Sequence, residues 1–532
     1  MNLSTSHTTA DPAAEVENVT VGALLRRVAE QTPEQVAVVE CRVGKTTERT
    51  LNYQQLLESA EAIGRWALLS HEPGDHIGIW APNSLDWYLL QLGFSLAGIT
   101  LVTVNPAFLK EEADYVLNHS GCKTVITVPD YRGAALTEIA QDIANNSATL
   151  ANVLDLNEVP SLVKKADTQA IALPDVSPDS PCMIQYTSGT TGTPKGATLG
   201  HAAVVNYAKF AELGLELPKG SKWVNFMPMF HTGGCIYMAL GCLWNKGVHL
   251  LVDSFDAEYT LQLIEEHRAH FLWCVPTMYF TMFEHPNFEK YDKSSLVVVA
   301  SGATTVPPEL VTRLETHFTG EFIMLFGQTE CGMICQTTRG DTLEHKSRTV
   351  GRAMPHTELK IASVETGDPL PVGEVGEICV RSPSVMLGYH QRPEATDAAI
   401  DQDGWLHTGD LGVMAADGYC AITGRIKDMI IRGGENIFPR EIEDVLIEHP
   451  DVLDISVFGI PDKRWGEQVA AAVRVAPGAT STDQELADYL RDKLARHKIP
   501  RAWMRMDAFP VTASGKVKKF ELRDQYVRNN VT

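Results

Sequence analysis

Apolar positions recur along the first third of the chain with two different spacings. Residues 51–69 and 85–97 carry apolar side chains at helical spacing, whereas residues 76–80 and 123–128 form short apolar runs typical of strands. Strands that alternate with helices in this way indicate an open, mostly parallel sheet with helices on both faces. The pattern therefore predicts an α/β fold.

The longest apolar stretch, residues 88–104, is too broken to predict a membrane span. Polar and small side chains interrupt it at Gln91, Gly93, Ser95 and Gly98, and an Asn-Pro pair ends it. We expect a buried helix followed by a strand instead.

The alternation of strands and helices resumes after a connector rich in proline and aspartate at residues 172–181. Strands are predicted at 272–275, 296–301 and 322–326, with a helix that begins at Pro307. Residues 373–389 predict short β-structure with turns.

A domain boundary is expected near residues 424–428. Beyond it, helices at 439–448 and 483–495 and strands at 454–459 and 468–475 suffice for a small α+β domain. We therefore expect a large domain over residues 1–425 and a small one over 426–532.

The net charge limits the kinds of surface that the protein can bind, and the cysteines indicate its redox environment. The formal net charge of −22 and the pI of about 5.2 argue against a general nucleic-acid or anionic-membrane surface. The ten cysteines are scattered singly, as in a reduced protein. The first twenty residues contain no lysine or arginine, which argues against a secretory or transit segment, and a cytoplasmic protein is expected.

Candidate chemistry is densest between residues 186 and 196, where glycines and hydroxyls precede a lysine. Glycines can expose consecutive backbone N–H groups to an anion, and hydroxyls add donors. The run lacks the Gly-Lys-Ser/Thr of a Walker loop. A strand at 183–184 is expected before it and a helix at 202–211 after it. A polyphosphate site is predicted from these residues: Thr187, Ser188, Gly189, Thr190, Thr191, Gly192 and Lys195.

This loop resembles the signature of the adenylate-forming superfamily, which includes acyl-CoA synthetases, peptide-synthetase adenylation domains and beetle luciferases. The resemblance extends from about residue 51 to the C-terminus and is greatest to bacterial medium-chain fatty or aryl acyl-CoA synthetases. It implies ATP, Mg²⁺ and coenzyme A. It also implies a large N-terminal domain of layered, mostly parallel sheets with a β-rich subdomain, and a small mobile α+β C-terminal lid.

The segment Phe-Gly-Gln-Thr-Glu at 326–330 is too polar for a core, although a strand end with a turn is the plain alternative. The resemblance implies that Phe326 flanks the adenine, with Gly327 and Gln328 beside the nucleotide. It also implies that Thr329 contacts phosphate and that Glu330 holds Mg²⁺, a hard cation that one carboxylate plus phosphates can bind.

Further positions gain roles only through the resemblance. It implies that Asp410 and Arg425 bind the ribose, although a turn aspartate is a common alternative. It places the hinge at Lys427, which could equally be a surface lysine. It singles out Lys516, in a lysine-rich segment, as the residue that bridges the attacking carboxylate and the α-phosphate.

The resemblance also implies an acyl pocket and a tunnel for the pantetheine arm of coenzyme A. It implies that His231 stands on one wall of the acyl pocket as a candidate catalytic residue that positions the substrate, with the small residues Ser301, Gly302 and Ala303 on the opposite wall. Ser301, Gly302 and Ala303 are also expected to contribute to the ATP- and AMP-binding site. Members of the superfamily often have glycine at the position of Ala303. The acyl pocket is expected to contain Phe230, His231, Gly234, Gly302 and Met333, and the tunnel to contain Gly433 and Gly434.

The sequence favours a two-step ligase that forms an acyl-adenylate with release of pyrophosphate and then passes the acyl group to coenzyme A. Two alternatives stay open: a stand-alone enzyme that loads a carrier-protein pantetheine, and a non-catalytic nucleotide-binding regulator. The carboxylic acid is expected to be a medium-chain fatty or aromatic acid, but which acid it is stays open, as does assembly into a homodimer.

Overall fold

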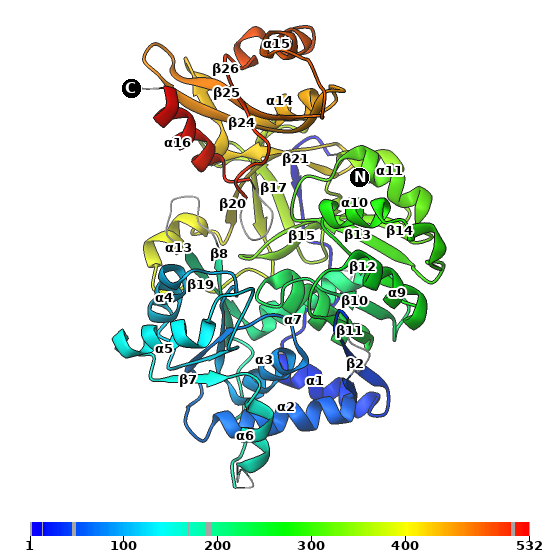
Figure 1. Cartoon of the computed structure of the whole chain (residues 1–532), viewed down its shortest axis with the longest axis vertical. Coiled ribbons are helices and arrows are strands. Elements are labelled where there is room, and N and C mark those ends of the chain that lie inside the picture. Colours follow the sequence, from blue (N-terminus) through cyan, green and yellow to red (C-terminus); the bar gives the residue numbers. More distant parts are fainter. Residues whose placement is uncertain are drawn as a thin grey trace. The chain divides into compact units, whose positions relative to one another are not determined.

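The computed structural model describes residues 3–12, 14–44, 49–166, 168, 170–187, 194–511 and 517–530 (Figure 1). The chain forms two compact units. The larger unit comprises Thr8–Leu359 and Val380–Leu406, and the smaller comprises Met1–His7, Lys360–Cys379 and His407–Thr532. Both combine sheets with helices, so the α/β class is confirmed.

One sheet of the larger unit has the strand order β19-β9-β8-β5-β4-β6-β7 in the described residues. The five strands from β8 to β7 run parallel. Strand β9 pairs antiparallel with β8, and β19 pairs antiparallel with β9. The strands are β4 (His76–Trp80), β5 (Thr100–Thr103), β6 (Thr124–Thr127), β7 (Asn152–Asp155), β8 (Pro181–Thr187), β9 (Lys195–Gly200) and β19 (Gly388–Tyr389).

The second sheet of this unit has the order β16-β15-β14-β13-β12-β10-β11-β2-β3. Its central strands, from β14 to β2, are parallel. The strands are β2 (Val36–Cys41), β3 (Arg49–Asn52), β10 (Lys222–Asn225), β11 (Val248–Val252), β12 (Phe271–Trp273), β13 (Val298–Gly302), β14 (Glu321–Gln328), β15 (Gly332–Gln336) and β16 (Arg352–Ala353).

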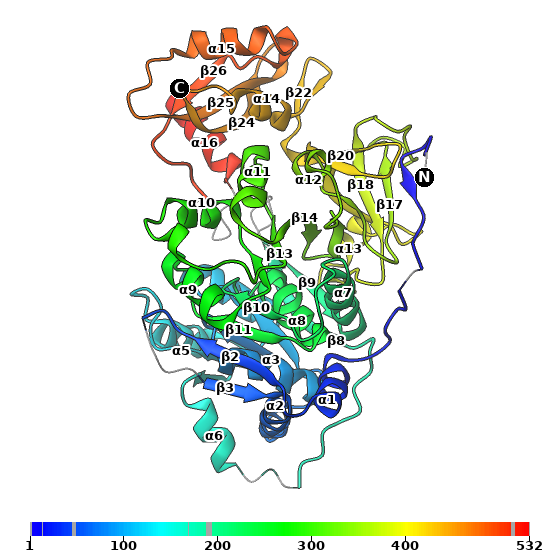
Figure 2. The ribbon, with the colours of Figure 1, turned by 90° about the vertical axis from the view of Figure 1, so that its right-hand side faces the viewer.

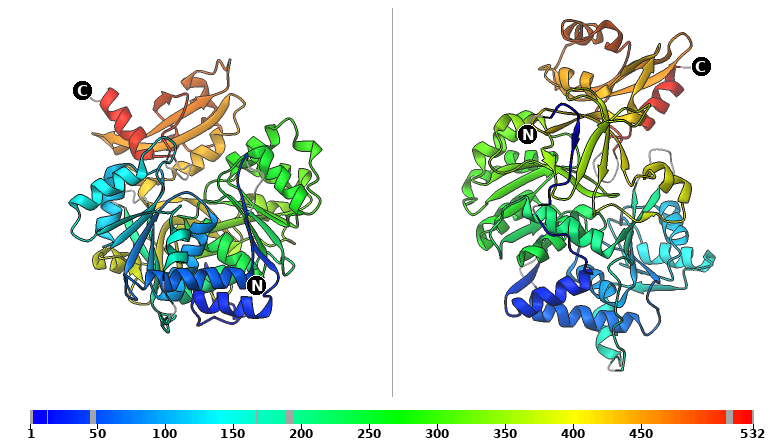
Figure 3. Two further views of the ribbon diagram at one scale, coloured as in Figure 1. Left: turned by 60° about the horizontal axis from the view of Figure 1, so that its bottom comes forward. Right: turned by 180° about the vertical axis from the view of Figure 1, so that it is seen from behind.

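Helices fill the space between these two sheets, as the left view of Figure 3 shows. The inner helices are α1 (Val21–Gln31), α2 (Tyr53–Ala67), α3 (Leu85–Ala97), α7 (His201–Leu213) and α8 (Ala239–Asn245). Helix α3 is buried on almost every side because its sequence is apolar all round. The Ser84 side chain caps its start and Gly98, with φ +70°, ends it.

Outer helices cover the other faces of the two sheets (Figure 2). Helices α4 (Lys110–His119) and α5 (Leu136–Asn146) lie on the seven-stranded sheet, and α9 (Ala257–His267) and α11 (Pro308–His317) on the nine-stranded one. The shorter helices are α6 (Val159–Lys165), α10 (Pro276–Glu284), α12 (Leu343–Arg348) and α13 (Pro393–Ala399).

The apolar stretch at residues 88–104 forms most of α3 and then β5, as predicted. Among the described residues, no helix has the length and apolar character needed to cross a membrane.

The smaller unit contains two sheets, with the orders β1-β17-β18-β20-β21 and β23-β22-β25-β24, and β26 pairs with β25. The strands are β1 (His7–Thr8), β17 (Glu358–Ala362), β18 (Gly376–Arg381), β20 (Leu406–Met414), β21 (Cys420–Arg425), β22 (Ile430–Arg432), β23 (Glu435–Ile437), β24 (Val452–Asp462), β25 (Gly466–Val475) and β26 (Ala502–Arg505). Its helices are α14 (Pro439–Leu446), α15 (Asp483–Arg491) and α16 (Lys519–Asn530).

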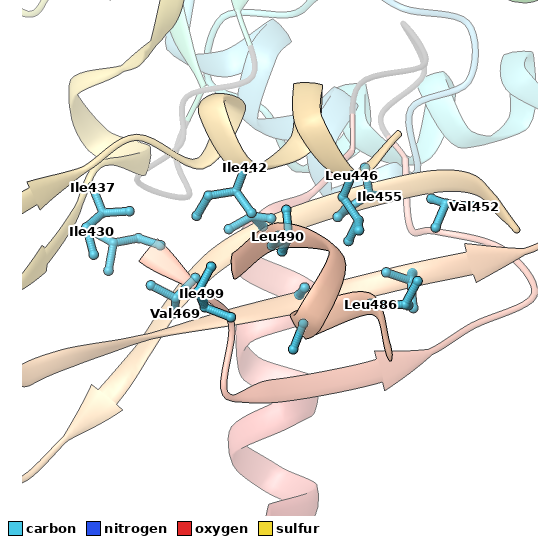
Figure 4. Packing of buried hydrophobic residues seen from close by; sticks show 14 residues of the cluster. Ile430, Ile437, Ile442, Leu446, Val452, Ile455, Val469, Leu486, Leu490 and Ile499 are labelled. Carbon is cyan, nitrogen blue, oxygen red and sulfur yellow. The ribbon is translucent and has the colours of Figure 1, made fainter. Parts of the chain in front are cut away.

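The long hairpin β24–β25 buries both of its faces because successive side chains point to opposite sides. Val457, Val469 and Ala471 join a core with helices α14 and α15, which Figure 4 shows. Phe458 and Ala470, one position along, join a second core beneath α16. The segment from Ile430 to Leu522 therefore encloses hydrophobic cores of its own, and the domain bounds 1–425 and 426–532 stay a prediction.

Candidate functional site

Three of four neighbouring parallel strands in the nine-stranded sheet lead into residues with candidate chemistry, and the fourth, β12, ends in a tryptophan that the sequence did not single out. The segment 226–234 follows β10, Trp273 ends β12, Ser301 and Gly302 end β13, and Phe326 to Gln328 end β14. Ligands of open α/β sheets bind outside the carboxyl ends of the strands. The fold thus brings together, at one edge, segments that the sequence analysis assigned separately to the acyl and nucleotide sites.

A tight turn after β14 holds Thr329 and Glu330. The pairing of β14 with β15 shifts register between Phe326 and Gly327. A Cβ at Gly327 would lie 2.4 Å from the carbonyl oxygen of Gly332, so only glycine permits this approach of the two backbones. Thr329 is buried, and Phe326 is 8% exposed.

Glu330 is connected to the predicted phosphate loop through a residue that the sequence analysis missed. The Tyr389 hydroxyl donates a hydrogen bond to Glu330 Oε1 at 2.9 Å. The Lys195 ammonium lies 4.9 Å from the centroid of the Tyr389 ring, a cation–π contact. Burial and the neighbouring Glu330 carboxylate raise the pKa of the Tyr389 hydroxyl, which therefore stays protonated as the donor.

The strands that flank the phosphate loop are well defined. Thr187 at the end of β8 pairs with Lys195 at the start of β9, and the Thr187 hydroxyl lies 3.5 Å from the Lys195 carbonyl oxygen. A Cβ at Gly196 would lie 2.8 Å from Ile184 and 3.0 Å from the Tyr186 ring. The predicted loop residues Ser188, Gly189, Thr190, Thr191 and Gly192 lie outside the described residues.

The helix expected at residues 202–211 is present as α7, but a strand that the sequence did not predict comes before it. This strand, β9, runs back along β8. Strand β9 also pairs with β19, which carries Tyr389. The extra strand is what places Lys195 beside Tyr389.

His231 lies in an exposed turn that leads into a π-helical segment at Gly233–Met238. Its Nδ1 accepts a hydrogen bond from the Gly233 N–H at 3.1 Å. A Cβ at Gly234 would lie 2.2 Å from the Pro228 carbonyl oxygen, and one at Gly233 would lie 2.5 Å from the Trp273 ring. Close packing therefore requires both glycines, and Trp273 covers the turn.

The small residues at 301–303 were expected to line the acyl pocket, but at Gly302 the close approach of a neighbouring strand is what requires glycine. A Cβ at Gly302 would lie 2.3 Å from the Leu325 carbonyl oxygen on β14, so glycine here serves strand packing. Ala303 has φ +65°, in the left-handed region that favours glycine. The Ser301 hydroxyl is buried without a hydrogen-bond partner among the described residues. Met333, on β15, is 8% exposed.

In the smaller unit, Asp410 and Arg425 form an ion pair. They face each other across β20 and β21, and Arg425 Nε lies 2.8 Å from Asp410 Oδ1. The Asp410 side chain is 4% exposed. Lys427 lies in a short 3₁₀ turn, Ile426–Asp428, with its side chain exposed.

Gly433 and Gly434 form the two-residue turn between β22 and β23. Their φ values of +63° and +88° are of the sign that a type I′ turn requires. A Cβ at Gly433 would lie 2.7 Å from the Trp465 ring, whereas Gly434 faces open space. The Arg432 and Arg464 guanidinium groups lie 5.3 Å and 4.9 Å from the Trp465 ring centroid.

The Glu330 carboxylate, which accepts a hydrogen bond from Tyr389, offers hard oxygen atoms that could hold a magnesium ion together with substrate phosphates. Lys516, predicted to act on the α-phosphate, lies outside the described residues.

Three aromatic residues were not identified from the sequence as part of a site. Trp465 had a signal that could have been used, because Lys-Arg-Trp-Gly at 463–466 places cations beside an aromatic ring. Tyr389 and Trp273 had none, because their contacts depend on strand pairing between distant segments.

Comparisons with known proteins agree with this architecture. The family model described as AMP-binding enzyme matches residues 25–390, and the one described as AMP-binding enzyme C-terminal domain matches residues 441–516. The mitochondrial medium-chain acyl-CoA ligase ACSF2 of Bos taurus is 36% identical over 549 residues, which cover 96% of this chain and 88% of that protein.

Solved structures with the same fold include two enzymes with a bound nucleotide or acyl-adenylate. ATP-bound MatB from Rhodopseudomonas palustris superimposes with a TM-score of 0.86 at 26% identity, covering 96% of this chain and 99% of that one. The o-succinylbenzoate CoA synthetase MenE of Bacillus subtilis, in complex with its acyl-adenylate intermediate, gives a TM-score of 0.83 at 27% identity with the same two coverages. With a family model that spans most of the larger unit and a relative of this identity over nearly its full length, the chain belongs to the AMP-binding enzyme family.

Proposed function

We propose that this protein is an ATP-dependent acid–CoA ligase. A carboxylate oxygen attacks the α-phosphorus of ATP, the bond to pyrophosphate breaks, and an acyl-adenylate forms. The coenzyme A thiol, on losing its proton, then attacks the acyl carbon and AMP leaves. No protein nucleophile is needed, so the protein must orient two anions, neutralise their charge and exclude water.

The observation that carries the proposal is the contact series Lys195–Tyr389–Glu330. It joins the strand beside the phosphate loop to the acidic residue after β14. Lys195 provides positive charge for the phosphates, and Thr187 and Thr329 provide hydroxyl donors. Mg²⁺ bound through Glu330 would neutralise charge on the triphosphate.

The smaller unit supplies the remaining groups. Asp410, oriented by Arg425, accepts hydrogen bonds from the ribose hydroxyls. Gly433 and Gly434 admit the pantetheine arm, and the Trp465 ring with its two guanidinium neighbours suits the adenine and phosphates of coenzyme A. We infer that residues 426–532 act as a lid on the domain 1–425, with Lys427 as hinge and Lys516 as the group that bridges carboxylate and α-phosphate.

The acid is proposed to be a medium-chain fatty or aromatic acid. Phe230 precedes His231 in the turn that Trp273 covers, and Met333 is an apolar residue of β15. The relative ACSF2 carries the name of a medium-chain acyl-CoA ligase. An aromatic substrate is supported by Phe230 and Trp273, whose rings offer edges and faces.

The test is release of AMP and pyrophosphate from ATP over a panel of aliphatic and aryl acids, with and without coenzyme A. A carrier-protein-loading enzyme would catalyse exchange between pyrophosphate and ATP when the acid is present, but it would form no acyl-CoA. A nucleotide-binding regulator would bind ATP and release no AMP with any acid.

Lys516→Ala separates the two half-reactions. We expect it to lose most acyl-adenylate formation while it still converts supplied acyl-adenylate and coenzyme A to thioester. Equal loss of both half-reactions would contradict the role of Lys516.

A cytoplasmic location is proposed from the ten cysteines, all of which are buried and none of which forms a disulfide among the described residues. Cell fractionation followed by detection of the protein tests it. Association into a homodimer can be measured by sedimentation.

A further inference from the structure

One buried carboxylate in the smaller unit has no role in the reaction described above. Glu377 lies on β18, its side chain is 11% exposed, and both of its oxygens accept hydrogen bonds. Oε2 lies 2.8 Å from His407 Nδ1, and Oε1 accepts the Gly409 N–H at 3.0 Å. Because an ionised carboxylate only accepts, the Nδ1 atom of His407 carries the proton in this pair.

These two bonds hold His407 and Gly409, two of the three residues that lead into Asp410, and the third, Thr408, is held by the neighbouring Ile378. The Thr408 hydroxyl donates to the Ile378 carbonyl oxygen at 2.6 Å and accepts the Asp410 N–H at 3.1 Å. Gly409 has φ +70°, and a Cβ placed on it would meet nothing within 4 Å. No neighbouring group therefore confines Gly409 by steric contact, and its N–H is held by the hydrogen bond to Glu377.

We propose that Glu377 is a positioning residue for the nucleotide site. It fixes the backbone at Gly409, and thereby the carboxylate of Asp410, in the orientation that accepts both ribose hydroxyls. The inference rests on the proposed function, because it assumes that Asp410 binds ribose. Arg425 holds one Asp410 oxygen directly, and Glu377 determines where the main chain presents that side chain.

The same residues include a set of donors that a transition metal could use. Cys379 Sγ lies 3.6 Å from His407 Nδ1, and one atom from each of Glu377, Cys379 and His407 lies within 4.8 Å of the others. A metal would have to replace the proton between His407 and Glu377. Because both Glu377 oxygens already accept N–H groups of this segment, we assign the cluster to backbone positioning.

The experiment compares ATP with 2′,3′-dideoxy-ATP by titration calorimetry on wild type, Glu377→Ala and Glu377→Gln. If Glu377 acts through the ribose contact, Glu377→Ala weakens ATP binding about tenfold. It leaves dideoxy-ATP binding unchanged, because that ligand lacks the hydroxyls. Glu377→Gln retains an oxygen for the Gly409 N–H and should recover part of the loss. The exposed Glu374→Gln serves as the matched control and should behave as wild type.

An equal loss of affinity for both nucleotides in Glu377→Ala overturns the inference, because it indicates general damage to the unit. A cobalt titration that gives a thiolate-to-metal absorption band in wild type, and none in Cys379→Ser, overturns it in favour of a metal site. Wild type that binds no ATP at all contradicts the proposed function itself. Wild type that prefers ATP to dideoxy-ATP, with Glu377→Ala showing the same preference, contradicts only the role of Glu377.

Discussion

Tyr389 makes two contacts that a single substitution can separate. Its ring lies under the Lys195 ammonium, and its hydroxyl donates to Glu330. Tyr389→Phe keeps the ring and removes the hydroxyl, so Glu330 loses one hydrogen bond. We expect acid-dependent pyrophosphate exchange to fall about tenfold, the loss typical of one such bond. Tyr389→Leu, which also removes the aromatic face, should fall further. Equal rates for the two variants would show that the hydroxyl alone matters.

Ala303 occupies a backbone conformation that suits glycine. Its φ of +65° costs an alanine roughly 1–2 kcal/mol. We expect Ala303→Gly to stabilise the larger unit by about 0.5–1 kcal/mol, since strain relief exceeds the added freedom of the unfolded chain. Urea unfolding checks this. Ala300→Gly, on strand β13 just before Ala303 and without positive φ, should destabilise it. A lower midpoint for Ala303→Gly would contradict the strain argument.

The β22–β23 hairpin offers a matched pair of substitutions at the element scale. Alanine at either Gly433 or Gly434 is strained by positive φ, but only a Cβ at Gly433 would lie 2.7 Å from the Trp465 ring. We therefore expect Gly433→Ala to raise the KM for coenzyme A about tenfold or more, the loss of roughly one good contact. Gly434→Ala should raise it less. Acid-dependent pyrophosphate exchange without coenzyme A should be unchanged in both variants. Equal KM values for the two variants would indicate that the strain of positive φ, and not contact with Trp465, weakens the binding of coenzyme A.

Elements with strong local signals could be predicted from the sequence, and elements that depend on distant pairing could not. Helix α3 and strand β4 begin and end where the apolar pattern predicts, because capping and periodicity are local. Strand β9 has small residues and no strand periodicity, and it is extended because it pairs with β8 and β19.

The candidate site shows the same difference between local and distant signals. Residues 326–330 were predicted to belong to a site because the segment is too polar for a core. Tyr389 was not, because its partner Glu330 is 59 positions away in sequence.

At the scale of the whole molecule, buried neutral histidines make stability depend on pH. Burial lowers the pKa of His201 to about 4 and that of His249 to about 3. Each is neutral in the folded state but binds a proton near pH 6.5 once unfolded, so unfolding takes up protons in acid. This contribution to stability is complete above about pH 6.5 and is lost as the pH falls through the folded pKa values.

We expect the larger unit to lose roughly 2 kcal/mol per buried histidine between pH 6.5 and pH 5. In His201→Asn the amide oxygen can still accept the Val21 N–H, which His201 Nδ1 accepts at 3.4 Å, but the group no longer titrates. Urea midpoints at pH 8 and pH 5 check the prediction, and the pH 8 value provides the baseline for any loss of packing. The variant should lose less stability than wild type on acidification. An equal loss in both proteins would show that His201 is charged in the folded state or that other groups dominate the acid response.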